Sequence, residues 1–531
     1  MAQIKSNLAD RLSRIESSFK VTVDHIRDAV QKLKVNKSDG NKGLISDMII
    51  KAPLSWLQLL AKLVTSMFIH GYCPEVLCKA TVTSLVKDPM GDLCDSNNYR
   101  GIALSSAINK IIDRVILTRS KESLQTSDLQ FAYKANNSTS MCSLALKEVA
   151  AYYIQNGGNV FCTMLDASKA FDRLRYDKLF QLLEGRNLDP IIFRFLLCSY
   201  EKQLTRTRWL TETSAYFSSE NGVRQGGVAS PILFTVYMDE LIHRLEGSHI
   251  GCYIGREFFG TLCYADDVTL LAPTVSALQH MLQVCEDFGK EYDVSYNPSK
   301  SVCLQIGGEI LQTRSDVFLN GQTIKWDNSA KHLGNIINTH NSDSNDIRQK
   351  RNDFLARSNS VFVTYRAASR EAKTKVFTSK CCCFYGSQTW RLASREVEEL
   401  HVTWRKAVRR LLNVPRNTRS ALLPYLMSCK PFIHQLSIRF ITMIKTIHKS
   451  QNSKMRWLIK ICPENGPTYD NVNFVASKWN LPIACVKNGN VKLSFIPDDT
   501  MLQRAQAIND FQNNLNLDTV LFDILYYLCT Y

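Results

Sequence analysis

The sequence predicts an α+β protein in which a mixed catalytic body is followed by a mostly helical, basic C-terminal part. Strand-like and helix-like apolar patterns alternate up to about residue 340, and the strand signals fade from about Asp346 onward. Charge marks the same boundary, since residues 341–420 hold 17 Lys and Arg against 7 Asp and Glu, more than half of the net charge of +16. A basic excess of this size favours a polyanionic partner.

The chain opens with a helix, a turn and a second helix. Apolar residues recur at helical spacing over residues 21–35, which predicts an amphipathic helix. Residues 36–43 are rich in Asn, Asp and Gly and predict a turn. A second helical pattern covers residues 55–70 and closes at Gly71, a residue typical of helix C-termini.

Strands are expected where short β-branched and apolar runs appear. The first such run covers residues 81–87, and the second covers residues 160–165. Helical patterns follow at residues 176–183 and 230–246. A β-hairpin is expected across residues 258–271, where two apolar runs flank a short acidic turn.

Two acidic motifs stand at the ends of these apolar runs. Asp166 ends the run 160–165, and Asp266 and Asp267 occupy the hairpin turn. If they meet in space, their charge calls for cations, and Mg²⁺ accepts one or two carboxylates plus substrate phosphates. Two such ions would activate a hydroxyl and stabilise a leaving pyrophosphate, which is nucleotidyl transfer. Taken singly, either motif is equally well read as a turn or cap.

A third motif lies between them, at residues 222–231, with the sequence GVRQGGVASP. Its small residues allow a substrate to approach the backbone closely. Ser230 is expected as the N-cap of the next helix and Pro231 as its first residue. Such a loop-to-helix element suits a platform beneath an incoming nucleotide and its templating base.

Together these motifs resemble a known family. FxxxLDASKAFD at 161–172, NGVRQGGVASPILF at 221–234 and YADD at 264–267 resemble palm motifs A, B and C of reverse transcriptases, in the form of the non-LTR (LINE-type) retrotransposon branch. The resemblance covers roughly residues 20–420. It includes five further groups of residues, at 37–44, 87–89 with 98–104, 297–301, 332–334 and 385–390.

The resemblance implies a right-hand polymerase fold, with fingers, a palm built on an antiparallel sheet, and a helical thumb. The expected parts are an N-terminal extension and fingers at 1–79, fingers and palm at 80–340, a basic helical thumb at 341–425, and a helical C-terminal extension of unassigned role at 426–531.

The implied activity is that of an RNA-directed DNA polymerase that adds deoxynucleotides to a primer 3′ end. Asp166, Asp266 and Asp267 would be catalytic and would hold two Mg²⁺ ions, for which Mn²⁺ could substitute. Lys300 would protonate the pyrophosphate as a general acid. Substrate-binding roles are implied for Lys87, Arg100, Phe171, Arg224, Gln225 and Gly226.

These substrate-binding roles have physical reasons. Lys87 and Arg100 would hold the triphosphate, because Arg presents a planar fork that matches phosphate oxygens. Phe171 would be a steric gate, since a bulky ring there would clash with a ribose 2′-OH. The thumb would contact the duplex backbone without regard to sequence. Its contacts are implied for Arg405, Lys406, Arg409 and Arg410.

The implied partners are an RNA template paired with a DNA primer, and deoxynucleoside triphosphates. Relatives usually carry an endonuclease before the polymerase, and about 20 residues precede the first resembling segment here. We therefore expect a separate endonuclease as a candidate partner. We also expect a nuclear and cytoplasmic location without a membrane, since no secretory signal or bilayer-length apolar run is present. The 17 cysteines include no Cys-x-x-Cys pair, which favours reduced thiols.

Three alternatives remain beside this reading. The first is a catalytically silent, RNA-binding remnant of the fold, against which the intact acids argue. The second is a group II intron maturase or a telomerase, although residues 98–104 and 385–390 favour the retrotransposon branch. The third is a viral RNA-dependent RNA polymerase, which would usually show Gly-Asp-Asp at the turn. Lys42, Ala229 and Gln388 depart from the branch pattern but remove no metal ligand.

Overall fold

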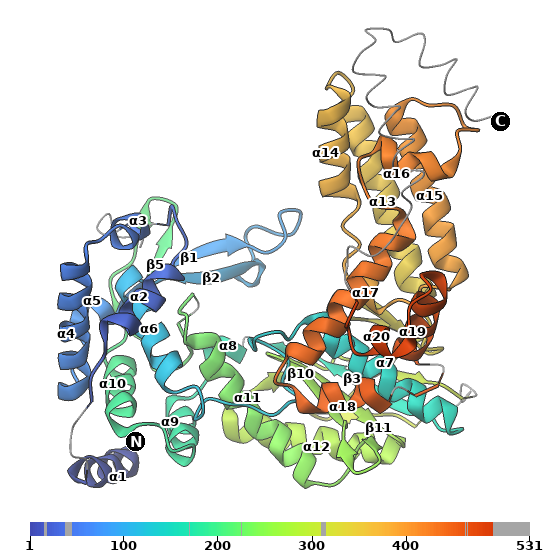
Figure 1. Cartoon of the computed structure of the whole chain (residues 1–531). Coiled ribbons are helices and arrows are strands. Elements are labelled where there is room, and N and C mark those ends of the chain that lie inside the picture. The colour runs from blue at the N-terminus through green and yellow to red at the C-terminus, as the bar shows by residue number, and fades with distance from the viewer. Residues whose placement is uncertain are drawn as a thin grey trace.

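The computed structural model describes residues 1–14, 19–37, 45–168, 170–224, 226–308, 315–461, 463–464 and 466–491. Figure 1 shows helices around a small sheet at the left, a larger sheet with its helices at the lower right, and a tall stack of helices above that sheet. We call these parts the fingers (19–120 and 176–219), the palm (139–168, 230–306 and 325–326) and the thumb (344–426). The predicted α+β class, with a helical C-terminal part, is confirmed.

The fingers are built on a sheet with the strand order β2-β1-β5-β6, with β7 also paired to β5. The sheet strands are β1 (Lys79–Val86), β2 (Tyr99–Leu104), β5 (Leu204–Trp209), β6 (Glu212–Thr213) and β7 (Phe217–Ser218). The helices of this part are α2 (Val23–Gln31), α3 (Ser46–Ile50), α4 (Leu54–His70), α5 (Glu75–Cys78), α6 (Ala107–Arg119), α9 (Tyr176–Gly185) and α10 (Pro190–Glu201). The β1–β2 hairpin extends beyond the helices, toward the side on which the thumb rises (Figure 1).

The predicted opening elements are confirmed where the structure describes them. The helix expected at 21–35 is α2, and the one expected at 55–70 is α4. Gly71 ends α4 in the left-handed conformation, with φ 59°. Most of the turn expected at 36–43 lies outside the described residues, which resume at Ile45.

The palm is a five-stranded sheet with the order β10-β11-β3-β13-β16, antiparallel except for the last pair. Its strands are β3 (Val160–Leu165), β10 (Thr261–Tyr264), β11 (Asp267–Ala272), β13 (Val302–Ile306) and β16 (Lys325–Trp326). The helices packed against it are α7 (Thr139–Gln155), α11 (Ser230–Gly247) and α12 (Val275–Tyr292). The strand predicted at 160–165 and the hairpin predicted within 258–271 are therefore both present.

Short strand pairs and helices complete the described part of the chain before residue 344. The strand pairs are β4 (Ala167–Ser168) with β12 (Ser295–Tyr296), β8 (Tyr253–Ile254) with β9 (Glu257–Phe258), β14 (Phe318–Leu319) with β15 (Gln322–Thr323), and β17 (Ser329–His332) with β18 (Asn335–Asn338). The short or peripheral helices are α1 (Ala2–Ser13) and α8 (Ala170–Arg173).

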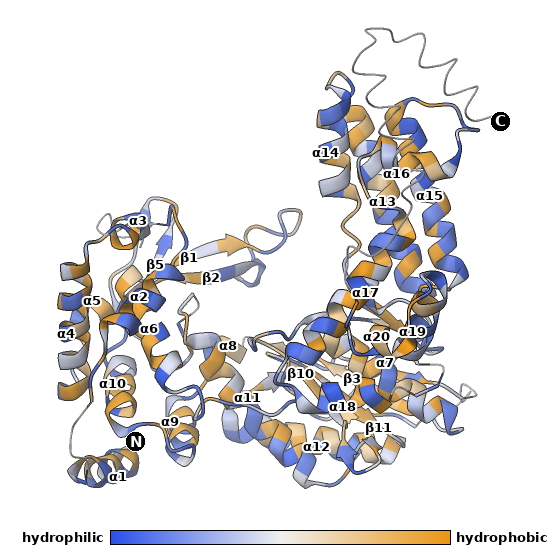
Figure 2. Cartoon of the chain, viewed as in Figure 1, coloured by the Kyte–Doolittle hydropathy of each residue, from blue (hydrophilic) through white to orange (hydrophobic). Residues whose placement is uncertain are grey.

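From Ser344 onward the described chain folds into helices. They are α13 (Ser344–Thr364), α14 (Arg370–Cys381), α15 (Arg395–Leu412), α16 (Leu423–Leu426), α17 (Phe432–Lys449), α18 (Ser453–Ile461), α19 (Pro467–Lys478) and α20 (Ile483–Lys487). Helix α15 of the thumb is amphipathic, with hydrophilic residues along its outer side (Figure 2) and Trp404 buried on its inner side. None of the helices described here is long and apolar enough to cross a membrane.

Buried polar groups join α7 of the palm to the C-terminal helices. The Lys147 ammonium pairs with the Asp343 carboxylate at 2.6 Å, and both side chains are almost fully buried. Its neighbour Glu148 accepts a hydrogen bond of 2.7 Å from the backbone N–H of Thr468, in the first turn of α19. The second carboxylate oxygen of Glu148 is buried and has no hydrogen-bond partner among the described residues. A charged Glu148 is therefore poorly accommodated here.

The pH dependence of stability should reveal this buried carboxyl. Burial raises the pKa of Glu148 from 4.5 to about 7, against the bonds from Thr468 that lower it. Between these values the folded chain holds a proton that the unfolded chain has lost, so the stability that Glu148 contributes falls as pH rises. The free energy of unfolding of the wild type should fall between pH 5 and pH 8. In Glu148→Gln, which has no carboxyl to titrate, we expect this fall to be smaller by about 2 kcal/mol.

Urea unfolding of both proteins at the two pH values measures this difference. Glu184→Gln, the same change on α9 at a carboxylate for which no buried contact is described, is the matched control. An identical pH dependence for wild type and Glu148→Gln would show that Glu148 is ionised in the folded chain throughout this range.

Candidate active site

The acidic turn predicted at 264–267 joins two buried strands of the palm. Tyr264 ends β10 and pairs with Asp267, the first residue of β11, so that Ala265 and Asp266 alone form the turn. Ala265 has φ 60°, a left-handed conformation that residues other than glycine seldom adopt. A turn of this kind needs support from its surroundings.

Gln130 supplies that support from a segment 135 residues away in the chain. Its side-chain oxygen accepts hydrogen bonds from the backbone N–H groups of Ala265 at 2.9 Å and Ala132 at 3.1 Å, and its amide nitrogen donates to the Ala265 carbonyl at 3.4 Å. The side chain is fully buried. No local pattern marks Gln130, because only the bridge between residues 130 and 263 brings it beside the turn. Sequence analysis missed this residue.

Asp166 follows β3 and lies beside the same turn. Leu165 pairs with Val268, so the antiparallel register places Asp166 across from Asp267. The backbone N–H of Asp166 donates to the Ser301 hydroxyl at 3.3 Å, and its carbonyl accepts from Asn297 N–H at 2.9 Å. Lys300 belongs to the turn that makes these two contacts, and its side chain is exposed.

The three carboxylates are close enough to influence one another. Burial first, and then the charge of Asp166, raise the pKa of Asp266, while Arg100 acts to lower it. Burial, Asp266 and Asp166, in that order, raise the pKa of Asp267 to about 6. The structure therefore brings the three predicted acids together at one end of the palm sheet, with a cationic side chain of the fingers within electrostatic reach.

This donor set fits hard divalent cations. Carboxylate oxygens are the ligands that Mg²⁺ prefers, and a bound cation would offset the repulsion that raises these pKa values. In the described part of the chain, no group of three or more His, Cys, Asp or Glu side chains is already arranged to hold a metal. Mg²⁺ needs only one or two protein carboxylates where substrate phosphates supply further oxygens.

Phe171 contacts both helix α11 and the motif at 222–231. Its ring stacks on Phe234 of α11, with 4.0 Å between ring centroids and an interplanar angle of 15°. Its carbonyl accepts a hydrogen bond of 3.0 Å from the N–H of Val223. The side chain is half-buried, so the stacking fixes the ring while part of it stays accessible.

The loop at 222–229 packs against the fingers sheet, although Gln225 lies outside the described residues. Gly226 has φ 111°, and a Cβ added there would collide with the carbonyl oxygen of Ala103 in β2. Glycine is therefore required by the fold at this position. Arg224 turns into the fingers, where it donates to the Gln203 side chain at 3.1 Å and the Ser199 carbonyl at 3.2 Å.

The start of α11 differs from the prediction. Ser230 is the first helical residue and Ala229 is the N-cap, so the expectation of Ser230 as the cap is wrong by one position. Ala229 has no side chain that could accept from the helix. The carboxylate of Asp113 in α6 accepts instead from the backbone N–H groups of Val228 and Ala229, just before the helix, which a local capping pattern could not reveal.

The two phosphate-binding candidates of the fingers lie on the β1–β2 hairpin, and both are exposed. Arg100 stands on β2 opposite Leu85. Lys87 follows β1 and donates from its ammonium group to the Asn97 carbonyl at 2.9 Å. Of the two, only Arg100 contributes to the electrostatic environment described for Asp266.

Of the four thumb residues predicted to contact nucleic acid, three make contacts within the thumb. Arg405 pairs with Glu398 at 2.8 Å, and Arg410 lies over the Phe362 ring at 4.6 Å. Arg409 donates to the Thr418 carbonyl at 2.8 Å and to the Ser420 hydroxyl. Lys406 is exposed on the same helix. The structure gives Arg409 an internal bridging position, and replacing it would disturb the thumb itself.

Comparison with known proteins defines the class. Residues 86–337 match the family model described as reverse transcriptase (RNA-dependent DNA polymerase). This stretch contains the palm strands β3, β10, β11 and β13 together with most of the fingers sheet. This stretch is identified as a reverse transcriptase domain, and the thumb helices of the chain follow it.

The relatives narrow the class further. The chain is 24% identical over 415 residues to the RNA-directed DNA polymerase from mobile element jockey of Drosophila funebris, covering 74% of this chain and 44% of the relative. It is 26% identical over 286 residues to a Pol polyprotein from retrotransposable element R2 of Popillia japonica, covering 53% and 39%. The domain is similar to the reverse transcriptases of non-LTR retrotransposons, and the chain spans less than half the length of these relatives.

Solved structures show only a distant likeness. A telomerase from Candida Tropicalis, determined with a fragment of telomeric RNA, covers 94% of this chain and 78% of its own length, at a TM-score of 0.42 and 13% identity. That likeness is too distant to add to the assignment.

Proposed function

We propose that this chain is an RNA-directed DNA polymerase that extends a DNA primer on an RNA template by two-metal nucleotidyl transfer. The observation that supports this most is the meeting of Asp166, Asp266 and Asp267 beside Arg100 at the end of the palm sheet. The reverse transcriptase family and the non-LTR relatives supply the template and product classes.

In this proposal each site residue has one task. Asp166 and Asp266 hold two Mg²⁺ ions, for which Mn²⁺ could substitute, and Asp267 supports them. The bound ions supply a lowered pKa for the primer hydroxyl and charge stabilisation for the leaving pyrophosphate. Arg100 and Lys87 bind the triphosphate, and Lys300, exposed in the turn beside Asp166, gives a proton to the pyrophosphate.

The proposal is tested by primer extension with purified protein, a DNA primer annealed to an RNA template, and deoxynucleotides with Mg²⁺. Extension that stops when the primer carries a 3′-deoxy end or when Mg²⁺ is chelated supports the proposal. Soluble, folded protein that binds the hybrid but does not extend the primer would favour the catalytically silent, RNA-binding remnant instead.

Phe171 tests the discrimination between sugars. We expect Phe171→Ala to raise the efficiency of ribonucleotide incorporation relative to deoxynucleotide by about tenfold or more, since the clash with the 2′-OH is removed. The measurement is the ratio of kcat/KM for the two nucleotides. Phe180→Ala, a fully buried aromatic change in α9, is the control, because its loss costs stability without touching the site. An unchanged ratio in Phe171→Ala would remove the gate assignment.

A further inference from the structure

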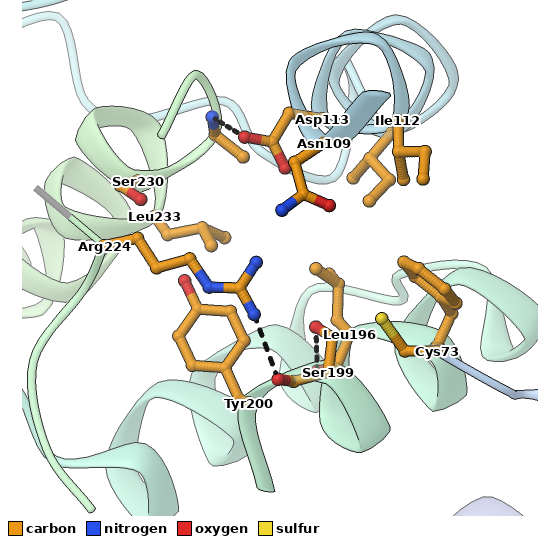
Figure 3. A pocket seen from close by; sticks show the side chains of 13 residues that line it. Cys73, Asn109, Ile112, Asp113, Leu196, Ser199, Tyr200, Arg224, Ser230 and Leu233 are labelled. Carbon is orange, nitrogen blue, oxygen red and sulfur yellow. Dashed lines mark hydrogen bonds between the residues drawn. The ribbon is translucent and has the colours of Figure 1, made fainter. Parts of the chain in front are cut away.

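The start of α11 is held by a half-buried carboxylate from a different part of the fingers. One oxygen of Asp113, in α6, accepts hydrogen bonds from the backbone N–H groups of Val228 at 2.8 Å and Ala229 at 3.1 Å. Figure 3 shows this side chain reaching from α6 to the end of the loop that precedes α11. The loop 222–229 is thus fixed at its C-terminal end by Asp113.

Arg224, in the N-terminal half of the same loop, anchors it to the fingers. Its guanidinium group enters a cavity of about 30 Å³, which Asp113 also lines, from the side opposite α6 (Figure 3). There it bonds to Gln203 and to the Ser199 carbonyl, in and beside α10. Burial raises the pKa of Asp113, against the N–H of Ala229, the positive charge of Arg224 and the N–H of Val228, which act to lower it. The two side chains brace one loop against two helices of the fingers.

The braced loop contacts the elements that carry the nucleotide-binding candidates. Gly226 packs directly on the Ala103 carbonyl of β2, and the same strand carries Arg100 three residues earlier. Val223 donates its N–H to the carbonyl of Phe171, whose ring lies on Phe234 in α11. A shift of the loop would therefore move the candidate triphosphate site and the candidate gate relative to each other.

We propose that Asp113 and Arg224 are positioning residues that hold the loop 222–229 in the one arrangement in which the deoxynucleotide site is complete. The inference rests on the proposed polymerase function. Neither residue touches the nucleotide. Arg224 was expected to contact the substrate directly, and its bonds inside the fingers support an indirect role instead.

Kinetics of single-nucleotide incorporation distinguish a positioning role of Asp113 from a role in stabilising the fold alone. We expect Asp113→Ala to raise the KM for deoxynucleotide by about tenfold while kcat changes less than about threefold, since binding geometry is lost while the acids stay in place. Asp113→Asn should recover most of the loss, because its amide oxygen can still accept from Val228 and Ala229. The ratio of kcat/KM for deoxynucleotide to kcat/KM for ribonucleotide should also fall in Asp113→Ala, because Phe171 is no longer held at a fixed distance from the loop.

The matched control is Ser199→Ala. Ser199 lines the same cavity, but its hydroxyl donates to the Leu196 carbonyl, and Arg224 uses only its backbone oxygen. We expect its KM and sugar ratio to equal those of wild type. An Asp113→Ala variant with normal KM, or one in which kcat alone falls, would overturn the proposal. So would equal KM changes in Asp113→Ala and Ser199→Ala.

Hydrogen exchange gives an answer that does not depend on polymerase activity. Amides in the peptide covering 222–234 should exchange at least about tenfold faster in Asp113→Ala than in wild type or Ser199→Ala, because two donors lose their acceptor. Should Asp113→Ala not fold, Asp113→Asn must show a smaller increase in the same peptide and no change in the palm strands. Unchanged exchange in Asp113→Ala would contradict the proposal that Asp113 positions the loop. If exchange is faster in Asp113→Ala but the wild-type protein extends no primer, the positioning role holds and the proposed polymerase function is rejected.

Discussion

Replacing Asp266 by Asn is expected to reduce primer extension at least about a thousandfold, while binding of the RNA–DNA hybrid stays within about twofold. Asn keeps the shape of the side chain and removes the charge that would hold a divalent cation. The acidic turn is not predicted to unfold. Burial and Asp166 raise the pKa of Asp266, so the ionised side chain destabilises the fold in the absence of cations, and thermal stability of the Asn variant without Mg²⁺ should be unchanged or higher.

The combination of lost activity and retained stability identifies a metal ligand. Single-turnover extension and thermal unfolding without Mg²⁺ are the two measurements. Asp287→Asn is the matched control, because Asp287 lies on the exposed side of α12, where it pairs with Lys290 at 3.5 Å. Its extension rate should equal that of wild type. If Asp266→Asn extends primers within tenfold of the wild-type rate, the cations are bound elsewhere.

The sequence predicted the core of the fold because its signals there are local. The apolar run that forms β3 ends one residue before Asp166. The sequence of the β10–β11 hairpin consists of two apolar runs on either side of a turn. The apolar residues of a buried strand predict its burial directly. An acidic residue at the end of such a strand can be identified without knowing which strand pairs with it. The helix predicted at 230–246, which is α11 in the structure, follows from the same kind of local pattern.

Roles that depend on a distant partner could not be predicted. Arg224 and Arg409 have the residue type of phosphate contacts, yet both bond inside the protein, to Ser199 and Thr418 respectively. The sequence around an arginine does not predict which acceptor its guanidinium group will bond to in the fold. Asp113 and Gln130 show the converse, since each looks like an ordinary polar residue and each acts on a backbone segment more than 100 residues away.

Gln130 leads to the second large effect. We expect Gln130→Ala to lower kcat by about a hundredfold, because the turn that carries Asp266 loses its support and a displacement of about 1 Å at reacting groups has this consequence. The N–H groups of Ala265 and Ala132 would lose their shared acceptor, and Ala265 would no longer be held at φ 60°. The KM for deoxynucleotide should change little, since Arg100 and the loop 222–229 make no contact described with Gln130.

A loss of kcat must be separated from a loss of folded protein, because a buried N–H without an acceptor costs about 1–3 kcal/mol of stability. Gln305→Ala provides the comparison: Gln305 is also fully buried in the palm, on β13 opposite Phe161, at a distance in the sheet from the acidic turn. It should lose similar stability and keep kcat near the wild-type value. Equal losses of kcat in both variants would mean that the palm as a whole was weakened. A low kcat in Gln130→Ala alone would mean that the geometry of the acidic turn is set by a side chain outside the catalytic motifs.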